Sequence, residues 1–143
     1  RVAARDLFDL YRLSQRYPGA FTDALTRALT VRSITAANPF PSLVDPVVAL
    51  ERFHAVAPDF TAPLTAMLRS EDARDFDEMQ TAVARWLRPL ATLSDEEAEY
   101  VRLLDEEATY APELLLGRWP EAAARARRDP VMEWKVKNLA SRR

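Results

Sequence analysis

Two carboxylates near the start of the chain, Asp6 and Asp9, are the side chains whose types and spacing could do chemistry. A spacing of three residues places both on the same side of a helix, about one turn apart. Arg5 and Arg12 share this polar face, and Leu7 belongs to the broad apolar arc on the other side. Asp6 lies at the edge of that arc, where partial burial could tune its pKa. The pair could hold a metal ion or deprotonate a hydroxyl.

The same spacing also has a purely structural explanation. Arg5 and Asp9 are separated by four positions, and Asp9 and Arg12 by three. Such pairs commonly form a solvated ladder of salt bridges on a helix surface. On spacing alone this ladder is the commoner outcome, so the spacing leaves both explanations open.

The elements that position these residues are short helices, because 10 prolines and 2 glycines punctuate the chain and proline is poorly tolerated inside a helix. The apolar periodicity predicts helices over residues 1–16, 21–33, 46–57, 61–69 and 73–91. We expect Thr22 to cap the second helix and Pro89 to end or kink the fifth. The segment 35–46 contains several prolines and should be an extended connection.

The second half of the chain carries clear signals for helix ends. Ser94 and Glu97 form a capping box, and Pro120 opens a short alanine-rich helix. Asp129 followed by Pro130 is a typical start for a last helix. A helix from residue 107 should break near proline 112 and close with Gly117 in a left-handed conformation. With no credible strand, the sequence predicts an all-α fold, a multi-helix orthogonal bundle of about seven to nine helices without a sheet.

Composition limits the functions open to the chain. Its 143 residues suit a single helical domain, with an alternative sub-division into residues 1–34 and 46–143. No cysteine and the single His54 leave no set of ligands for a zinc site, and His54 is expected to be half-buried. No apolar stretch is long enough to span a membrane, so a cytoplasmic location is expected. Because Arg1 already lies inside a helical pattern, we expect a C-terminal fragment of a longer chain.

The C-terminal part is basic, whereas the rest is acidic. Residues 118–143 carry 8 basic and 3 acidic side chains, and residues 1–117 carry 12 and 19. The basic tail could attract an RNA acceptor through its phosphates, although solvated helix ends are the commoner explanation of such a run. Three tryptophans, Trp86, Trp119 and Trp134, are expected to anchor helix packing.

The stretch Arg-Asp-Leu-Phe-Asp-Leu-Tyr over residues 5–11 resembles the R-D-hydrophobic-x-D-L motif of the AbiEii/AbiGii-type nucleotidyltransferase toxins, the toxin half of type IV toxin–antitoxin systems. Residues 129–139, with Trp134, also look like the last helix of that family. In the family, the motif follows an N-terminal nucleotidyltransferase core. The core's glycine-serine turn and D-x-D metal pair have no counterpart here, and the acidic pair Asp75 and Asp77 should face solvent.

The resemblance implies a helical accessory domain that supplies one wall of a nucleotidyl transfer site. Asp6 would be a catalytic carboxylate, a general base toward the acceptor hydroxyl, supported by Asp9, while Arg5 and Arg12 would bind substrate. The parent protein would use Mg²⁺ and a nucleoside triphosphate, and this fragment alone would bind neither and be inactive. Its expected partners are the nucleotidyltransferase domain of the same chain, a cognate antitoxin and an RNA acceptor, but no membrane. The alternative is a non-catalytic helical protein-interaction domain.

Overall fold

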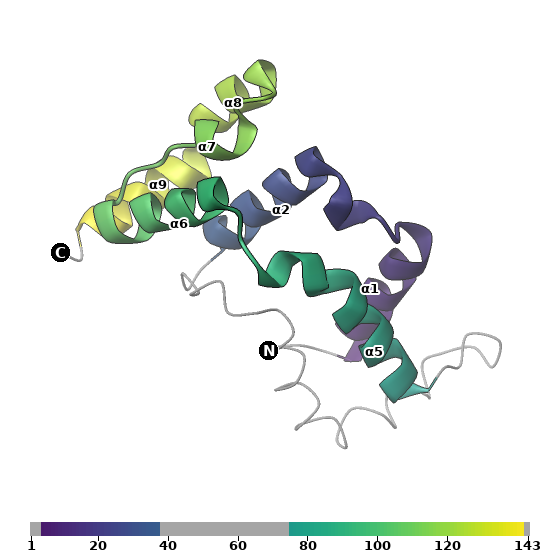
Figure 1. Ribbon diagram of the computed structural model, residues 1–143. Helices are drawn as coiled ribbons and strands as arrows, with labels where there is room; N and C mark the ends of the chain where they lie inside the picture. Colours follow the sequence, from purple (N-terminus) through teal and green to yellow (C-terminus); the bar gives the residue numbers. More distant parts are fainter. Residues whose placement is uncertain (1–3, 38–74, 142–143) are drawn as a thin grey trace. The chain divides into compact units, whose positions relative to one another are not determined.

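The computed structural model of the protein describes residues 4–37 and 75–141, and Figure 1 shows the path of the chain. Within these residues there are seven α-helices and no strand. The all-α class expected from the sequence is therefore confirmed for the described part. The helices predicted over 46–57 and 61–69, the connection after residue 37 and His54 lie outside it.

The helices are short, as the prolines predicted. The α-helices are α1 (Ala4–Arg16), α2 (Ala24–Ala36), α5 (Phe76–Leu87), α6 (Asp95–Glu107), α7 (Glu113–Leu116), α8 (Pro120–Arg127) and α9 (Pro130–Ala140). Two 3₁₀ turns, η1 (Ala20–Thr22) and η2 (Arg88–Ala91), follow α1 and α5. No helix in the described stretches is long and apolar enough to cross a membrane.

The chain folds into two compact units that alternate along the sequence. One unit comprises Arg1–Thr22 and Val44–Thr92, and the other comprises Asp23–Leu43 and Leu93–Arg143. The sequence predicted a single domain, with a possible sub-division into residues 1–34 and 46–143. That sub-division followed the proline-rich segment, whereas packing pairs α1 with α5 and gathers α2 with α6, α7 and α9.

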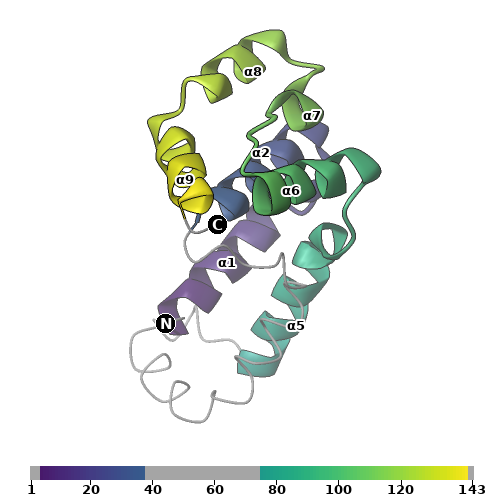
Figure 2. The same ribbon diagram turned by 90° about the vertical axis from the view of Figure 1, so that its left-hand side faces the viewer.

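In the first unit, α1 packs along α5, and the pair can be followed in Figures 1 and 2. Its core consists of Leu7, Met79 and Val83, each at most 1% exposed. At the end of α5, the Trp86 ring lies 4.6 Å from the Phe21 ring, centroid to centroid. Apolar burial of this kind is the main force that holds two short helices together.

Pro89 ends α5 as expected, because the chain tightens there into the 3₁₀ turn η2. The start of the same helix is capped by Asp75, whose carboxylate accepts a 2.8 Å hydrogen bond from the Asp77 backbone N–H. Both aspartates are exposed, as predicted. Asp75 therefore serves as an N-cap.

In the second unit, α2 lies against α6, α7 and α9. The largest fully buried side chains there include Tyr100, Leu104, Leu116 and Met132. The Tyr100 hydroxyl is not left unpaired, because the Thr35 hydroxyl lies 3.1 Å away. A buried hydroxyl needs such a partner, since an unmatched one would destabilise the fold.

A partly buried ion pair joins α2 to the start of α6. Arg27 donates through Nε and Nη2 to the two carboxylate oxygens of Glu97, each at 2.6 Å. Glu97 also accepts from the Ser94 backbone N–H at 2.8 Å, which completes the predicted capping box. One glutamate thus caps a helix and fastens it to another.

Two helix caps differ from the sequence expectation. The N-cap of α2 is Asp23, whose carboxylate accepts from the Thr26 backbone N–H at 2.7 Å, and Thr22 belongs to the preceding turn. Among the described residues, the one with left-handed backbone geometry is Ala108, with φ 52°, at the end of α6. Gly117 is right-handed, and its missing Cβ matters because such an atom would lie 2.7 Å from the Glu113 carbonyl oxygen.

Candidate functional site

The polar face of α1 is exposed in the first unit, and the opposite face is packed. Asp6, Asp9 and Arg12 are exposed, while Leu7 and Ser14 are buried. Ser14 satisfies its hydroxyl by donating to the Tyr11 carbonyl at 2.7 Å within the same helix. The two-sided pattern expected from the sequence is therefore confirmed, because contact with α5 selects the apolar side for burial.

The expected partial burial of Asp6 is wrong. Asp6 is exposed rather than partly buried, although Phe8, Leu10 and Tyr11 of the apolar arc pack against the core of the unit. No group of three or more His, Cys, Asp or Glu side chains that could hold a metal ion occurs among the described residues. The chemistry of this face thus rests on two carboxylates one turn apart.

Arg12 and Asp9 share a shallow depression on α1. Its volume is about 700 Å³, and it is lined by Asp9, Arg12, Leu13, Gln15 and Arg16. The Arg12 guanidinium also lies 5.9 Å from the centre of the Phe8 ring, within cation–π range. The structure brings Asp9 and Arg12 together, and the side chain of Arg5 lies outside the described part.

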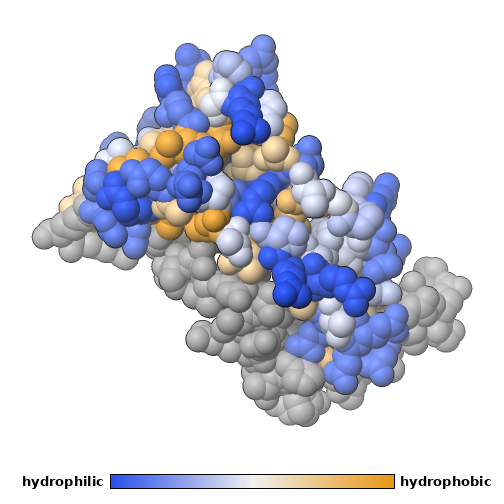
Figure 3. Space-filling model, viewed as in Figure 1, coloured by the Kyte–Doolittle hydropathy of each residue, from blue (hydrophilic) through white to orange (hydrophobic). Residues whose placement is uncertain are grey.

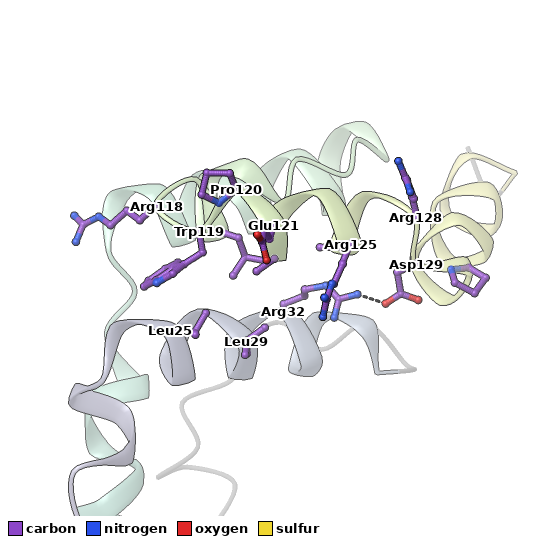
Figure 4. Close-up of a pocket in the computed structure, with 14 residues that line it drawn as sticks. Leu25, Leu29, Arg32, Arg118, Trp119, Pro120, Glu121, Arg125, Arg128 and Asp129 are labelled. Atoms are coloured by element: carbon purple, nitrogen blue, oxygen red, sulfur yellow. Dashed lines mark hydrogen bonds and ion pairs between the residues drawn. The ribbon is translucent and has the colours of Figure 1, made fainter.

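A second concave site lies in the other unit, between α2 and α8 (Figure 4). We call it the arginine groove, and its volume of about 880 Å³ is in the range of binding clefts. Apolar side chains form much of its lining, and four arginines and two carboxylates complete it. The lining residues are Leu25, Leu29, Arg32, Leu116, Arg118, Trp119, Pro120, Glu121, Ala122, Arg125, Ala126, Arg128, Asp129 and Pro130.

One of the four arginines is engaged within the protein. Arg32 forms an ion pair with Asp129 and donates through Nε to the Tyr110 hydroxyl at 2.8 Å. Arg118, Arg125 and Arg128 have no ion-pair partner in the part of the chain that the structure describes. These three guanidiniums are therefore available to a ligand.

The basic tail is not one continuous charged surface. Lys135 is buried and donates from Nζ to the Ala37 carbonyl, and Arg127 pairs with Glu113. Arginines 142 and 143 lie outside the described residues. Of the tail residues, it is Arg118, Arg125 and Arg128 that gather at the groove.

Sequence reasoning missed this groove. Arg125 lies on α8 and Arg118 in the turn before that helix, so helical spacing does not connect them, whereas Leu25 and Leu29 are four residues apart on α2. The spacing on α2 could be seen alone, but nothing in the sequence connects α2 with α8. Trp134 was also misjudged, because it is 57% exposed and anchors no core.

The surface of the second unit carries both apolar and hydrophilic side chains. Figure 3 shows apolar patches among strongly hydrophilic side chains around α6 and α7. Val131 and Trp134 add exposed apolar side chains on α9, at 54% and 57% exposure. Their spacing of three residues places them on one side of that helix.

Comparison with known proteins gives no relative from which a role could be transferred. No model of a protein family matches the chain, and neither the curated proteins nor the solved structures contain a match.

Proposed function

We propose that this chain is a helical accessory region of a toxin-type nucleotidyltransferase, and that α1 presents Asp6 and Asp9 to a catalytic core elsewhere in the same protein. The observation that carries the proposal is the two-sided character of α1. Its carboxylates and Arg12 are exposed, while Leu7 on the other side is buried against α5. The resemblance of residues 5–11 to the motif of that family supplies the reaction class.

In this proposal Asp6 accepts the proton of the acceptor hydroxyl as that oxygen attacks the α-phosphate of a nucleoside triphosphate, and the bond from the α-phosphorus to the bridging oxygen breaks to release pyrophosphate. Asp9, one turn away, supports it, and Arg12 contacts a phosphate through its guanidinium. The core would supply most ligands of the Mg²⁺ that neutralises the triphosphate. An RNA acceptor and a cognate antitoxin are the proposed partners, and the proposed location is the cytoplasm.

A second candidate function is a non-catalytic protein-interaction domain. The exposed pair Val131 and Trp134 on α9 favours it, because large apolar side chains on a surface are common at protein interfaces. In that case the polar face of α1 is an ordinary solvated surface, and its carboxylates take no part in a reaction.

The two functions are separated by replacing Asp6 with asparagine in the full-length protein. We expect transfer of labelled nucleotide to RNA to fall by about 100-fold or more, which is the usual contribution of a general base. Asp105→Asn is the matched control, because Asp105 is also an exposed helical aspartate but lies on α6. It should leave transfer unchanged.

The proposal fails if the full-length protein transfers no nucleotide, or if Asp6→Asn transfers it as fast as the unmodified protein. Circular dichroism of each variant shows whether the helices persist. Because Asp6 is exposed, its replacement should not unfold α1.

A further inference from the structure

We propose that the arginine groove binds an acidic amphipathic helix of a partner protein. The groove lies entirely within the second unit, between α2 and α8. The groove shares no residue with the polar face of α1, so this inference is independent of the proposed function.

Both walls of the groove carry apolar side chains at helical spacing. On α2, Leu25 and Leu29 are four residues apart, and Leu29 is 41% exposed. On α8, Ala122 and Ala126 are also four apart, and their small side chains leave room between the walls. A helix with apolar residues at positions i, i+3, i+4 and i+7 presents a stripe that fits two such rows.

The charges around the groove select an acidic occupant. Arg125 extends between the walls beside Arg32, while Arg118 and Arg128 lie at the two ends with their side chains directed outward (Figure 4). Asp129 already neutralises Arg32, whereas Arg118, Arg125 and Arg128 have no ion pair among the described residues. A guanidinium can bind a carboxylate through two parallel hydrogen bonds. Glutamates that flank an apolar stripe would meet these three groups.

A nucleic acid fits the same groove less well. Four arginines and two carboxylates leave a net charge of only +2, which matches a few glutamates better than a phosphate backbone with one negative charge per nucleotide. The apolar side chains on α2 and α8 make no favourable contact with a charged phosphate backbone. Trp119 could stack on a base, so a single-stranded RNA is the competing occupant in the test.

The test uses a synthetic helix and the whole chain. The probe is a fluorescent peptide of about 16 residues, roughly four turns, with leucines at i, i+3, i+4 and i+7 and glutamates on both flanks. A second peptide carries lysine in place of every glutamate. Fluorescence anisotropy should give a dissociation constant at least about tenfold lower for the glutamate peptide.

Three variants locate the binding. Leu29→Asn and Arg125→Glu should each weaken binding of the glutamate peptide by about tenfold or more. Lys137→Glu is the control, because Lys137 is an exposed cation of the same unit that does not line the groove. It should change binding little. Both groove side chains can be replaced without disturbing a core, since Leu29 and Arg125 are exposed.

Four results would overturn the inference. The first three are no binding of the glutamate peptide, equal binding of the lysine peptide, and a loss of binding in Lys137→Glu as large as in Arg125→Glu. The fourth is tighter binding of a single-stranded RNA that depends on Arg125 but not on Leu29, which would assign the groove to phosphates. Retained helicity of each variant by circular dichroism excludes unfolding as the cause.

Discussion

Replacement of Arg27 by methionine should destabilise the second unit by about 2–3 kcal/mol. The guanidinium makes two hydrogen bonds of 2.6 Å to Glu97, and a hydrogen bond to a charged group contributes about 1.5–3 kcal/mol. Breaking a fully buried ion pair costs about 3–5 kcal/mol. Here the exposed fractions of the Arg27 and Glu97 side chains are 20% and 8%, so solvent screens part of the interaction.

A double-mutant cycle with Glu97→Gln isolates the ion pair from the helix cap. Glutamine can still accept the hydrogen bond from the Ser94 backbone N–H, so the capping box persists. We expect a coupling free energy of about 2 kcal/mol between Arg27 and Glu97. Urea unfolding followed by circular dichroism, with amide exchange in α6, measures it.

Arg102 provides the matched control for this experiment. It pairs with Glu99, Glu106 and Glu107, three carboxylates of its own helix, but its side chain is 41% exposed. Its removal should leave stability nearly unchanged, because solvated ion pairs contribute little. If Arg102→Met costs as much as Arg27→Met, burial is not what decides the strength of these pairs.

The same pair predicts a pH dependence. Burial raises the pKa of Glu97, but hydrogen bonds from Arg27 and Ser94 outweigh it, so the pKa lies below the usual glutamate value. The stabilisation is therefore present above the unfolded pKa and is lost as pH falls through the lower folded pKa. Arg27→Met should flatten the acid limb of the curve of stability against pH, which is the part where stability is lost as pH falls. An unchanged acid limb, or a coupling below about 0.5 kcal/mol, would refute the reasoning.

Two further predictions concern a backbone contact and a buried phenol. Gly117→Ala should destabilise the second unit by about 1–3 kcal/mol, because the new Cβ would lie 2.7 Å from the Glu113 carbonyl oxygen. Ala108→Gly should stabilise the same unit by up to about 1 kcal/mol, because Ala108 has a φ of 52°, which glycine adopts without strain. Urea unfolding that ranks the two variants the other way would contradict this. Burial raises the pKa of Tyr100 to about 12, so its contribution to stability is present below about pH 10 and is lost as pH rises through the folded value. Alkaline titration of tyrosinate absorbance should show one late component that Tyr100→Phe lacks, and its persistence in that variant would disprove the assignment.

Features that depend on neighbouring residues could be predicted from the sequence. The capping box of Ser94 and Glu97, the start of α9 at Pro130 and the end of α5 near Pro89 are all present. Each depends on groups within one helical turn, so the local sequence contains all the partners. The exposed face of α1, with Asp6 and Asp9, follows from the same periodicity.

Features that depend on distant partners could not be predicted. The sequence gives no sign that Arg27 will meet Glu97, which is 70 positions away. The left-handed cap was expected at Gly117 because glycine is the usual residue there, but α6 ends at Ala108 instead. The groove between α2 and α8 was missed for the same reason, because it forms only when these two helices, which are far apart in the sequence, lie opposite each other.

The alternating order of the two units has a consequence for synthesis on the ribosome. Three contacts that hold α2 in place join residues 70, 97 and 98 positions apart, namely Arg27 with Glu97, Arg32 with Asp129, and Ala37 with Lys135. At roughly 5–20 residues per second, α2 leaves the ribosome several seconds before its last partner is made. During that interval the apolar side chains of α2, Val31 among them, lack the complete set of helices α6, α7 and α9 that α2 contacts in the folded protein. A nascent chain of this protein should therefore depend on chaperones until Lys135 has been made.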